Sequence, residues 1–337
     1  MGAGASADEG VTVDGELAKV LSASDGDLAA ARLARGARGG IRPLLSALGG
    51  VRGVVARGHG FARHPSGRVG VAMARRPGTF AVAFELDGDA PPMTFHTPKD
   101  RHFQGHGVFE PQGRYLFATE NDFEGERGCL GIYDSADGYK RVGELPSHGV
   151  GCHELVLMPD GKTLAVANGG ILTHPASGRA KLNIGTMAPN LAYVDLASGE
   201  LMDKAEYTAG RKSKLSIRHL AVTPDGRIVF ACQDQGDTAD GLDLVAMHRP
   251  GSGGLVEWPA PEGLTLGLAG YCGSVAVNTA GTLAAVSAPR GNRQRELREA
   301  LTTRRGRRRA RGQGGAEARR KLPDKPVPVH GENLQLA

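Results

Sequence analysis

The chain has 337 residues, of which 40% are hydrophobic, and a formal net charge of +5 at pH 7. Its basic charge is concentrated between Arg290 and Lys321, a run with 13 arginines and lysines against three glutamates. Because this run has no aromatic side chain that could stack on a base, we interpret it as a solvated charged tail and expect no nucleic-acid partner. The rest of the chain is mildly acidic, which argues against a nucleic-acid-binding domain.

The two ends of the chain differ from its middle. All 16 aromatic residues lie between Phe61 and Tyr271, and a packed β protein normally uses aromatics throughout. We therefore expect residues 1–54 to be helical or irregular and residues 293–337 to form a disordered, arginine-rich tail. Arg42 and Arg52 interrupt the apolar stretch near the amino terminus, so we predict no membrane span. The first ten residues show no export signal.

A repeated unit occupies residues 55–292. Four stretches begin with His and run into a Pro-x-Gly turn, and a fifth copy, SVAVNTAGT, keeps the pattern without the His. The four are HGFARHPSGR, HGVFEPQGR, HELVLMPDGK and HLAVTPDGR. The glycines of the five turns are 46 to 65 residues apart. Self-similarity at this period indicates units that need their neighbours to bury a core.

Each unit predicts strands rather than helices. The second reads as a strand, a turn at Gln112-Gly113, a strand over 115–119, a polar loop over 120–127 and a strand over 129–134. Short β-rich runs bounded by Gly, Pro, Asn and Asp are typical of hairpins. With an outer fourth strand, the unit equals a propeller blade, so the sequence predicts an all-β fold, a β-propeller with about five blades. A sandwich fits less well, because it has no reason to repeat this unit.

In a propeller, the inner strand starts at the rim where the second strand ends, so residues at both points face one funnel. Four histidines that open inner strands are candidate metal ligands: His59, His106, His153 and His219. Polar residues that end second strands are candidate ligand-binding residues: Glu120, Asn121, Asn168 and Gln233. Imidazoles beside a carboxylate suit iron or another divalent metal, and an anionic ligand is the alternative.

A structural explanation of these histidines stays open, in which each ring binds the neighbouring blade. His59 and His153 precede their turn prolines by six positions, whereas His106 and His219 precede theirs by five. A shift of one residue reverses the face of a strand side chain unless a bulge absorbs it. We therefore expect at most two of the four rings to share an orientation.

The loop over 168–190 adds His174 and Arg179 to the ligand-binding candidates. Long loops of this kind are often functional, and an anion, a partner and a solvated flap remain open as its role. Ser216 and Ser274 lack a nucleophile elbow, and no phosphate-binding glycine motif is present. We assign no catalytic residue and favour a binding protein over an enzyme. The four cysteines have no CxxC spacing, and we interpret them as small buried residues.

Four long motifs resemble a bacterial family of unknown function, number 1513 in the domain-of-unknown-function series, over about residues 55–292. They are RHFQGHGVFEPQGRYLFATENDFEGERGCLGIYD, CHELVLMPDGKTLAVANGGILTHPASGRAKLN, TMAPNLAYVD and LSIRHLAVTPDGRIVFACQ. The resemblance implies a seven-bladed-like propeller, exported to the periplasm by the twin-arginine route and encoded in iron-uptake gene clusters. It implies imelysin-like and di-haem peroxidase-like partners, and it adds Arg218 to the ligand-binding candidates. Both ends of the chain depart from the family.

Three hypotheses follow. The first is a binding module in iron acquisition, with a metal or a partner at the His-rich rim. The second is a metal-dependent hydrolase or lactonase, with histidines and Glu120 as ligands or base. The third is an inert scaffold. Convergence of three or more ligand side chains on one point favours the first two hypotheses over the third.

Overall fold

The structure is a computed structural model that describes residues 58–297, except 87, 89, 179, 208–209, 259–263 and 292. The segment 1–54 and the expected tail beyond residue 297 lie outside the described residues. The first residues of that expected tail, Arg293–Leu297, form a strand. Within the described part of the chain, no helix is long and apolar enough to cross a membrane.

Four sheets contain four antiparallel strands each, and a fifth sheet contains three. Blade 1 consists of β1 (Gly58–Arg63), β2 (Val69–Ala74), β3 (Phe80–Glu85) and β4 (Met93–His96). Blade 2 consists of β5 (Arg101–Phe109), β6 (Tyr115–Asp122), β7 (Arg127–Asp134) and β8 (Lys140–Pro146). Blade 3 consists of β9 (Cys152–Leu157), β10 (Thr163–Asn168), β11 (Asn190–Asp195) and β12 (Leu201–Glu206).

The last two sheets follow the same order along the chain. Blade 4 consists of β13 (Leu215–Val222), β14 (Ile228–Asp234), β15 (Val245–His248) and β16 (Val256–Glu257). Blade 5 consists of β17 (Ser274–Val277), β18 (Ala284–Ala288) and β19 (Arg293–Leu297). The short helices are α4 (Leu264–Gly267), η1 (Ser135–Asp137), η2 (Pro175–Ser177), η3 (Ile184–Thr186), η4 (Gly210–Lys214), η5 (Thr238–Asp240) and η6 (Pro289–Gly291).

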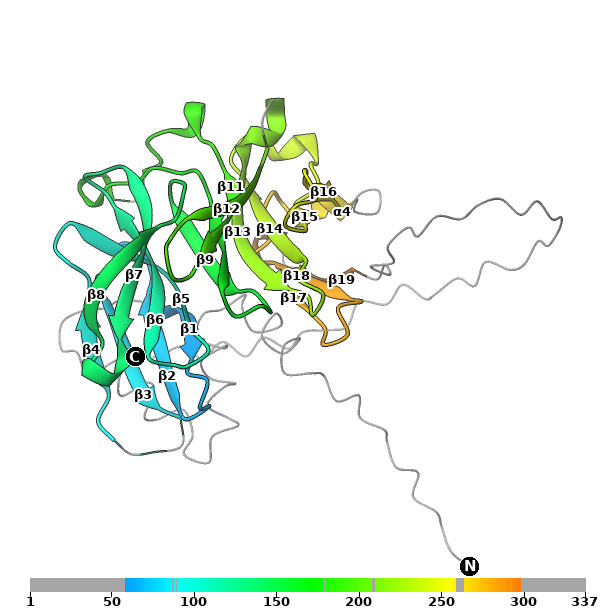
Figure 1. Ribbon diagram of the computed structural model, residues 1–337. Helices are drawn as coiled ribbons and strands as arrows, with labels where there is room; N and C mark the ends of the chain where they lie inside the picture. The colour runs from blue at the N-terminus through cyan, green and yellow to red at the C-terminus, as the bar shows by residue number, and fades with distance from the viewer. Residues whose placement is uncertain are drawn as a thin grey trace, which may run out of the picture. The chain divides into compact units, whose positions relative to one another are not determined.

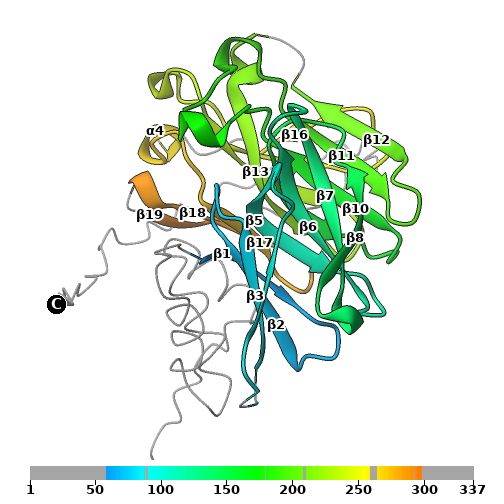
Figure 2. The same ribbon diagram turned by 90° about the vertical axis from the view of Figure 1, so that its left-hand side faces the viewer.

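The blades are arranged as in a β-propeller. The inner strands β1, β5, β9, β13 and β17 contact one another in that order, so each blade lies beside the next one in the sequence. Figures 1 and 2 show this succession from the blue blade 1 to the orange blade 5. The predicted fold class is confirmed, with four complete blades and a three-stranded fifth sheet.

The five turn glycines of the repeat share one backbone conformation. Gly67, Gly113, Gly161, Gly226 and Gly281 all have φ between 64° and 81°. Each donates its amide hydrogen to the carbonyl three residues earlier, as Gly67 does to His64 and Gly226 to Thr223. Only glycine adopts this left-handed conformation at no steric cost, which explains why every unit has Gly at this place.

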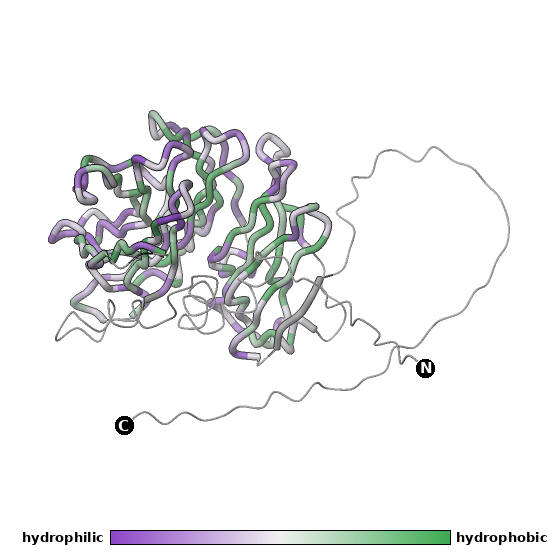
Figure 3. The backbone as a smooth tube through the Cα atoms, turned by 90° about the horizontal axis from the view of Figure 1, so that it is seen from below, coloured by the Kyte–Doolittle hydropathy of each residue, from purple (hydrophilic) through white to green (hydrophobic). Residues whose placement is uncertain are grey.

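Apolar side chains hold neighbouring blades together. Every residue of β14 is buried, and Phe230 from this strand packs in one cluster with Tyr193 of blade 3 and Leu215 of blade 4. Burying one such side chain stabilises the fold by about 1.5–3 kcal/mol. Figure 3 shows apolar segments running through the strands and hydrophilic ones gathering in the connecting loops. These interfaces fix the inner strands that present the polar residues described below.

Strand pairing places the start of each inner strand beside the end of the second strand. Arg101 pairs with Asp122, and Cys152 pairs with Asn168. Leu215 of β13 is the corresponding partner of the last residue of β14. We call this end of the blades the histidine rim, defined by the starts of β1, β5, β9, β13 and β17 and by the loops that follow the second strands.

Candidate metal centre

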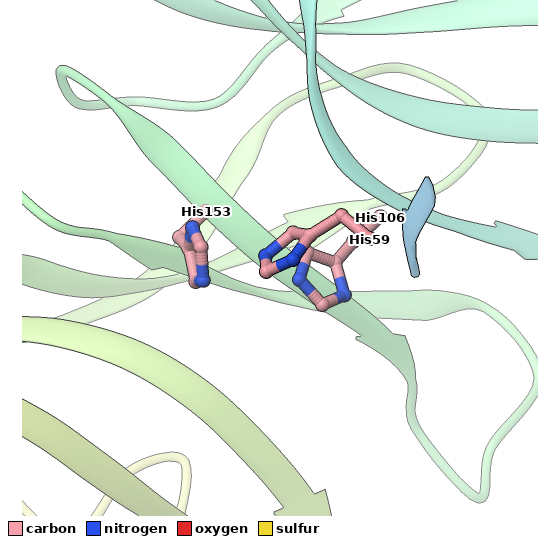
Figure 4. A group of neighbouring side chains, drawn as sticks. All are labelled: His59, His106 and His153. Atoms are coloured by element: carbon pink, nitrogen blue, oxygen red, sulfur yellow. The ribbon is translucent and has the colours of Figure 1, made fainter. Parts of the chain in front are cut away.

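The four histidines of the repeat, one from each inner strand of blades 1 to 4, gather at one point. His59 and His153 are the second residues of β1 and β9. His106 and His219 lie in the middle of β5 and β13, so the expectation that all four open their strands was wrong for these two. Neighbouring ring centroids are 4.8 Å apart for His59 and His106, 4.9 Å for His106 and His153, and 4.8 Å for His153 and His219. His59 and His219, from the first and fourth blades, are 6.4 Å apart. Figure 4 shows three of these rings side by side. We call the four residues the histidine cluster.

Irregular pairing explains how rings from different register positions meet. In β9, Cys152 and Glu154 pair with adjacent residues of β10, so His153 is an extra residue between them. In β13, Arg218 is the extra residue, and His219 follows it in register. A bulge of this kind turns the local backbone and redirects a side chain. These bulges absorb the one-residue difference in the distance from His153 and from His219 to their turn prolines.

The inner strands of blades 1 and 2 are irregular at the same place. The pairing shifts between Gly58 and Phe61 in β1, around His59, and between Phe103 and Gly107 in β5, around His106. The expectation that at most two rings share an orientation was therefore wrong. It depended on regular strands, and none of the four strands is regular at its histidine.

Two glycines make room for the first pair of rings. A Cβ atom on Gly105 would lie 2.5 Å from Cδ2 of His59, and Gly105 has φ of +108°, which favours glycine. A Cβ atom on Gly60 would lie 2.1 Å from the Gly105 carbonyl oxygen and 3.0 Å from Nδ1 of His106. Each His in these two blades thus has a glycine neighbour that permits the close approach.

Glu154 fixes two members of the cluster. Its Oε2 atom accepts hydrogen bonds from Nδ1 of His219 and from the amide of Leu220, both at 3.0 Å, and its Oε1 atom is 3.4 Å from Nδ1 of His106. An ionised carboxylate only accepts hydrogen bonds, so the ring hydrogen of His219 lies on Nδ1. A neutral ring in this state has a bare Nε2 lone pair.

The Nε2 atoms of His106, His153 and His219 are buried and have no hydrogen-bond partner among the described residues. Buried polar atoms normally find a partner, and an exception calls for an explanation. His153 is 5% exposed and His219 is 6% exposed. Three ring nitrogens without a hydrogen-bond partner therefore lie where water has little access.

The electrostatics keep the rings of His59, His153 and His219 neutral. Burial lowers the pKa of His59, His153 and His219, and nearby imidazoles and the charge of Arg218 lower it further. For His219 the hydrogen bond to Glu154 opposes this shift without cancelling it. Burial alone would raise the pKa of Glu154, but its contacts with His106 and His219 hold that pKa well below the usual range. At neutral pH the centre combines imidazole lone pairs with one carboxylate.

This donor set suits a first-row transition metal. One ring nitrogen from each of His59, His106 and His153 lies within 4.8 Å of the others, and the same holds for ligand atoms of His106, Glu154 and His219. Ligand atoms of a tetrahedral ion with bonds of about 2.0–2.1 Å are about 3.3 Å apart. Movements of about 1 Å would bring the ring nitrogens of His59, His106 and His153 to this spacing.

Glu120 does not join the cluster. Its side chain is fully buried, accepts a hydrogen bond from the Tyr133 hydroxyl and forms a 2.9 Å ion pair with Arg141. Arg141 also binds Glu144 at 2.6 Å. The reason is geometric, since a second-strand side chain points to a face of its sheet rather than along the strand into the channel. Glu120 is thus a buried ion-pair residue and not the ligand-binding residue that the sequence analysis expected.

A second group with metal-ligand spacing consists of Glu120, Cys129 and Glu144. Its carboxylates already form ion pairs with arginines. Arg141 binds both carboxylates, and Arg127 binds Glu144 at 2.5 Å. These guanidinium groups satisfy the charges that a metal would otherwise neutralise. The four cysteines are free and buried, which agrees with their interpretation as small buried residues.

Asn121 and His174 both take part in the contact between the β10–β11 loop and blade 2. The Asn121 amide lies 3.2 Å from Nε2 of His102 and donates to the Thr173 carbonyl at 3.1 Å. The ring of Phe123 contacts both His102 and His174. This contact docks the β10–β11 loop on blade 2 and is not part of the histidine cluster.

The remaining candidates differ in their positions. Asn168 donates to the Ser147 carbonyl and to Asn190, so it supports the loop rather than the cluster. The backbone of Gln233 bridges to Tyr271 of the next segment. Arg218 adjoins His219, and its charge acts on three rings of the cluster. Arg179 lies outside the described residues.

Sequence reasoning did not place Glu154 in the site, although a signal existed. The two residues that stand eight and seven positions before each turn glycine are His-Gly, Gly-His, His-Glu, Arg-His and Gly-Ser in blades 1 to 5. The pairing of the inner strand is irregular around these positions in blades 1 to 4. The position beside the histidine therefore also supplies the site, as Glu154 does beside His153.

The family model described as "Protein of unknown function (DUF1513)" matches residues 52–314. The chain belongs to this family. No curated protein matches the chain. Among solved structures it is similar to the crystal structure of the Cps50 (Swd1) β-propeller domain of Myceliophteria thermophila, with 14% identity, a TM-score of 0.48 and coverage of 70% of this chain and 68% of that one.

Proposed function

We propose that this DUF1513 protein is a metal-binding β-propeller that holds a first-row transition metal at the histidine cluster. The observation that carries the proposal is the arrangement of Glu154: it binds Nδ1 of His219 and approaches Nδ1 of His106. The Nε2 atoms of both rings are left buried without a hydrogen-bond partner in the described part of the chain. A carboxylate that orients the far nitrogen of a ligand histidine is a recurrent device in metal sites.

His59, His106 and His153, whose ring nitrogens lie within 4.8 Å of one another, would hold the ion, with the unpartnered Nε2 of His219 as a fourth ligand. Because burial already keeps His59, His153 and His219 neutral, binding at neutral pH would release few protons. Neutral imidazoles accept iron, copper, cobalt and zinc alike. We place iron first because of the family resemblance to proteins of iron-uptake gene clusters.

Bacterial iron acquisition, with export to the periplasm and imelysin-like or di-haem peroxidase-like partners, is part of the same proposal. A hydrolase or lactonase gains less support, because Glu120, expected there as a ligand or base, is fully buried and ion-paired with Arg141. The propeller would then act as a binding module that stores, senses or presents the ion.

The test is a calorimetric titration of iron(II), copper(II), cobalt(II) and zinc(II) into the full chain, with iron handled without oxygen. We expect one equivalent of metal in the wild type and at least tenfold weaker binding in His153→Ala, which corresponds to about 1.4 kcal/mol. His148→Ala is the matched control, because Nε2 of His148 binds the Gly199 carbonyl at 2.9 Å. This control should lose stability and keep its metal affinity.

Absence of metal uptake by the folded wild type would end the proposal. Equal affinities for His153→Ala and wild type would do so as well, since the ion would then bind elsewhere.

A further inference from the structure

Cationic side chains from four blades gather around the mouth of the histidine cluster. We call them the cation collar: Arg75, Arg76, Lys181, Arg218 and Arg290. Arg75 and Arg76 follow β2, Lys181 lies between β10 and β11, and Arg290 follows β18, so the topology brings them to the histidine rim. Arg218 is the bulge residue of β13, directly before His219.

Hydrogen bonds and a cation–π contact connect the loops of three blades at this mouth. Lys181 donates from Nζ to Oε1 of Gln235 at 2.5 Å, and the Gln235 amide in turn donates to the Gln233 carbonyl. Gln233 forms a backbone bridge with Tyr271, over whose ring the guanidinium of Arg290 lies at 5.3 Å. Lys181 and Arg290 are therefore presented from neighbouring loops, and both are exposed to solvent.

The collar lies beside the cluster, and its charges act on one another. Arg75 follows Ala74, whose pairing partner Gly58 precedes His59. Burial, followed by the charges of Arg290, Arg218 and Arg76, lowers the pKa of Lys181. Like charges gathered at one mouth raise the positive electrostatic potential there.

Two aspartates that end second strands at this rim are engaged by arginines outside the collar. Asp234 is engaged by Arg211 at 2.6 Å. Asp122 is engaged by Arg101 at 3.0 Å and Arg127 at 2.8 Å. A metal ion added among neutral imidazoles would increase the positive charge, with Glu154 as the one carboxylate that contacts the cluster in the described part of the chain.

We propose that the centre binds its metal together with a small anionic oxygen ligand, a carboxylate or an oxyanion, which enters between Lys181 and Arg290 and completes the coordination of the ion. This inference rests on the proposed metal site and names the second component that the site recognises. Electrostatic complementarity supplies the reason, because the anion would offset both the ion and the collar. A lysine and an arginine are the usual partners of such oxygens.

The experiment uses the full chain loaded with cobalt(II), whose visible absorption reports on the ligands of the ion. Oxalate and inorganic phosphate are titrated separately, so that a chelating carboxylate and a tetrahedral oxyanion are distinguished. We expect a saturable change of the cobalt bands with at least one of them, while gel filtration confirms that cobalt stays bound. Lys181→Met should weaken this anion binding at least tenfold.

Lys204→Met is the matched control, since Lys204 lies on the outer strand β12 and pairs with Glu206 at 3.2 Å. It should leave anion binding as in the wild type. A cobalt-loaded protein that gives no saturable change with either anion would overturn this inference and leave the metal proposal standing. Equal losses in Lys181→Met and Lys204→Met would overturn it too. Failure to bind cobalt at all would instead refute the proposed function.

Discussion

Replacing Glu154 by Gln tests the metal centre without removing any proposed imidazole ligand. Glu154 faces three donors, which are Nδ1 of His106, Nδ1 of His219 and the amide of Leu220. The amide of Gln offers one acceptor oxygen, and its NH2 group must face one of these donors. The opposed ring is then driven to carry its hydrogen on Nε2, where it no longer binds a metal.

We expect the metal affinity of Glu154→Gln to fall by about 10- to 100-fold, which corresponds to about 1.4–2.7 kcal/mol. Loss of the negative charge beside the ion acts in the same direction. The assay is a competition titration of zinc(II) or cobalt(II) against a coloured chelator at pH 7.5, and ring nitrogen shifts measured by NMR report the tautomers of His106 and His219.

Glu124→Gln is the control, because Oε1 of Glu124 lies 3.4 Å from Nε2 of His174 and the glutamate side chain is 71% exposed. This variant makes the same chemical change beside a histidine outside the cluster and should bind metal as the wild type does. A folded Glu154→Gln protein with unchanged metal affinity and unchanged tautomers would refute the reasoning, since the carboxylate would then have no influence on the ligand nitrogens.

Two further predictions concern stability. Arg141→Met leaves the fully buried Glu120 without its cation, so the free energy of unfolding in urea should fall by about 3–5 kcal/mol; a loss below about 1 kcal/mol would show that the ion pair is not needed. Burial lowers the pKa of His102 from 6.5 to about 4. The unfolded chain therefore binds more protons between these values, and stability should decrease as the pH falls through this window, by up to about 3 kcal/mol from this ring. Urea unfolding of wild type and His102→Gln between pH 7 and pH 4 measures the difference, and identical pH profiles would contradict the assignment.

The fold could be predicted from the sequence because its signals are local. Each unit has a turn glycine, and Gly113 and Gly226 have the positive φ that such a turn requires. The spacing of the turns identified blades, and short apolar strands such as β14 provided the buried interfaces. The number of strands in the fifth sheet was less evident, because the weakly apolar segment around β19 lacks the signals of an outer strand.

The site could be predicted only in part. The histidines were found because they open the repeat, but their common orientation depends on bulges, such as the extra residue His153 in β9. A bulge leaves no distinct mark in one sequence, since it is a property of pairing between two strands. The prediction for Glu120 failed for a related reason. The end of a strand does not define where a side chain points, because the pleat directs Glu120 onto Tyr133 and Arg141.

The position of the cluster explains how a few side chains from separate repeats come together. Each blade packs mainly on its neighbours, yet His59 of blade 1 and His219 of blade 4 are 6.4 Å apart. Blades that are distant in the chain therefore meet at the axis, where each contributes one or two side chains from its inner strand. No single blade contains enough ligands for an ion, so the centre exists only when the blades are assembled. An ion bound there would contact four blades at once and would stabilise their arrangement by an amount set by its own affinity.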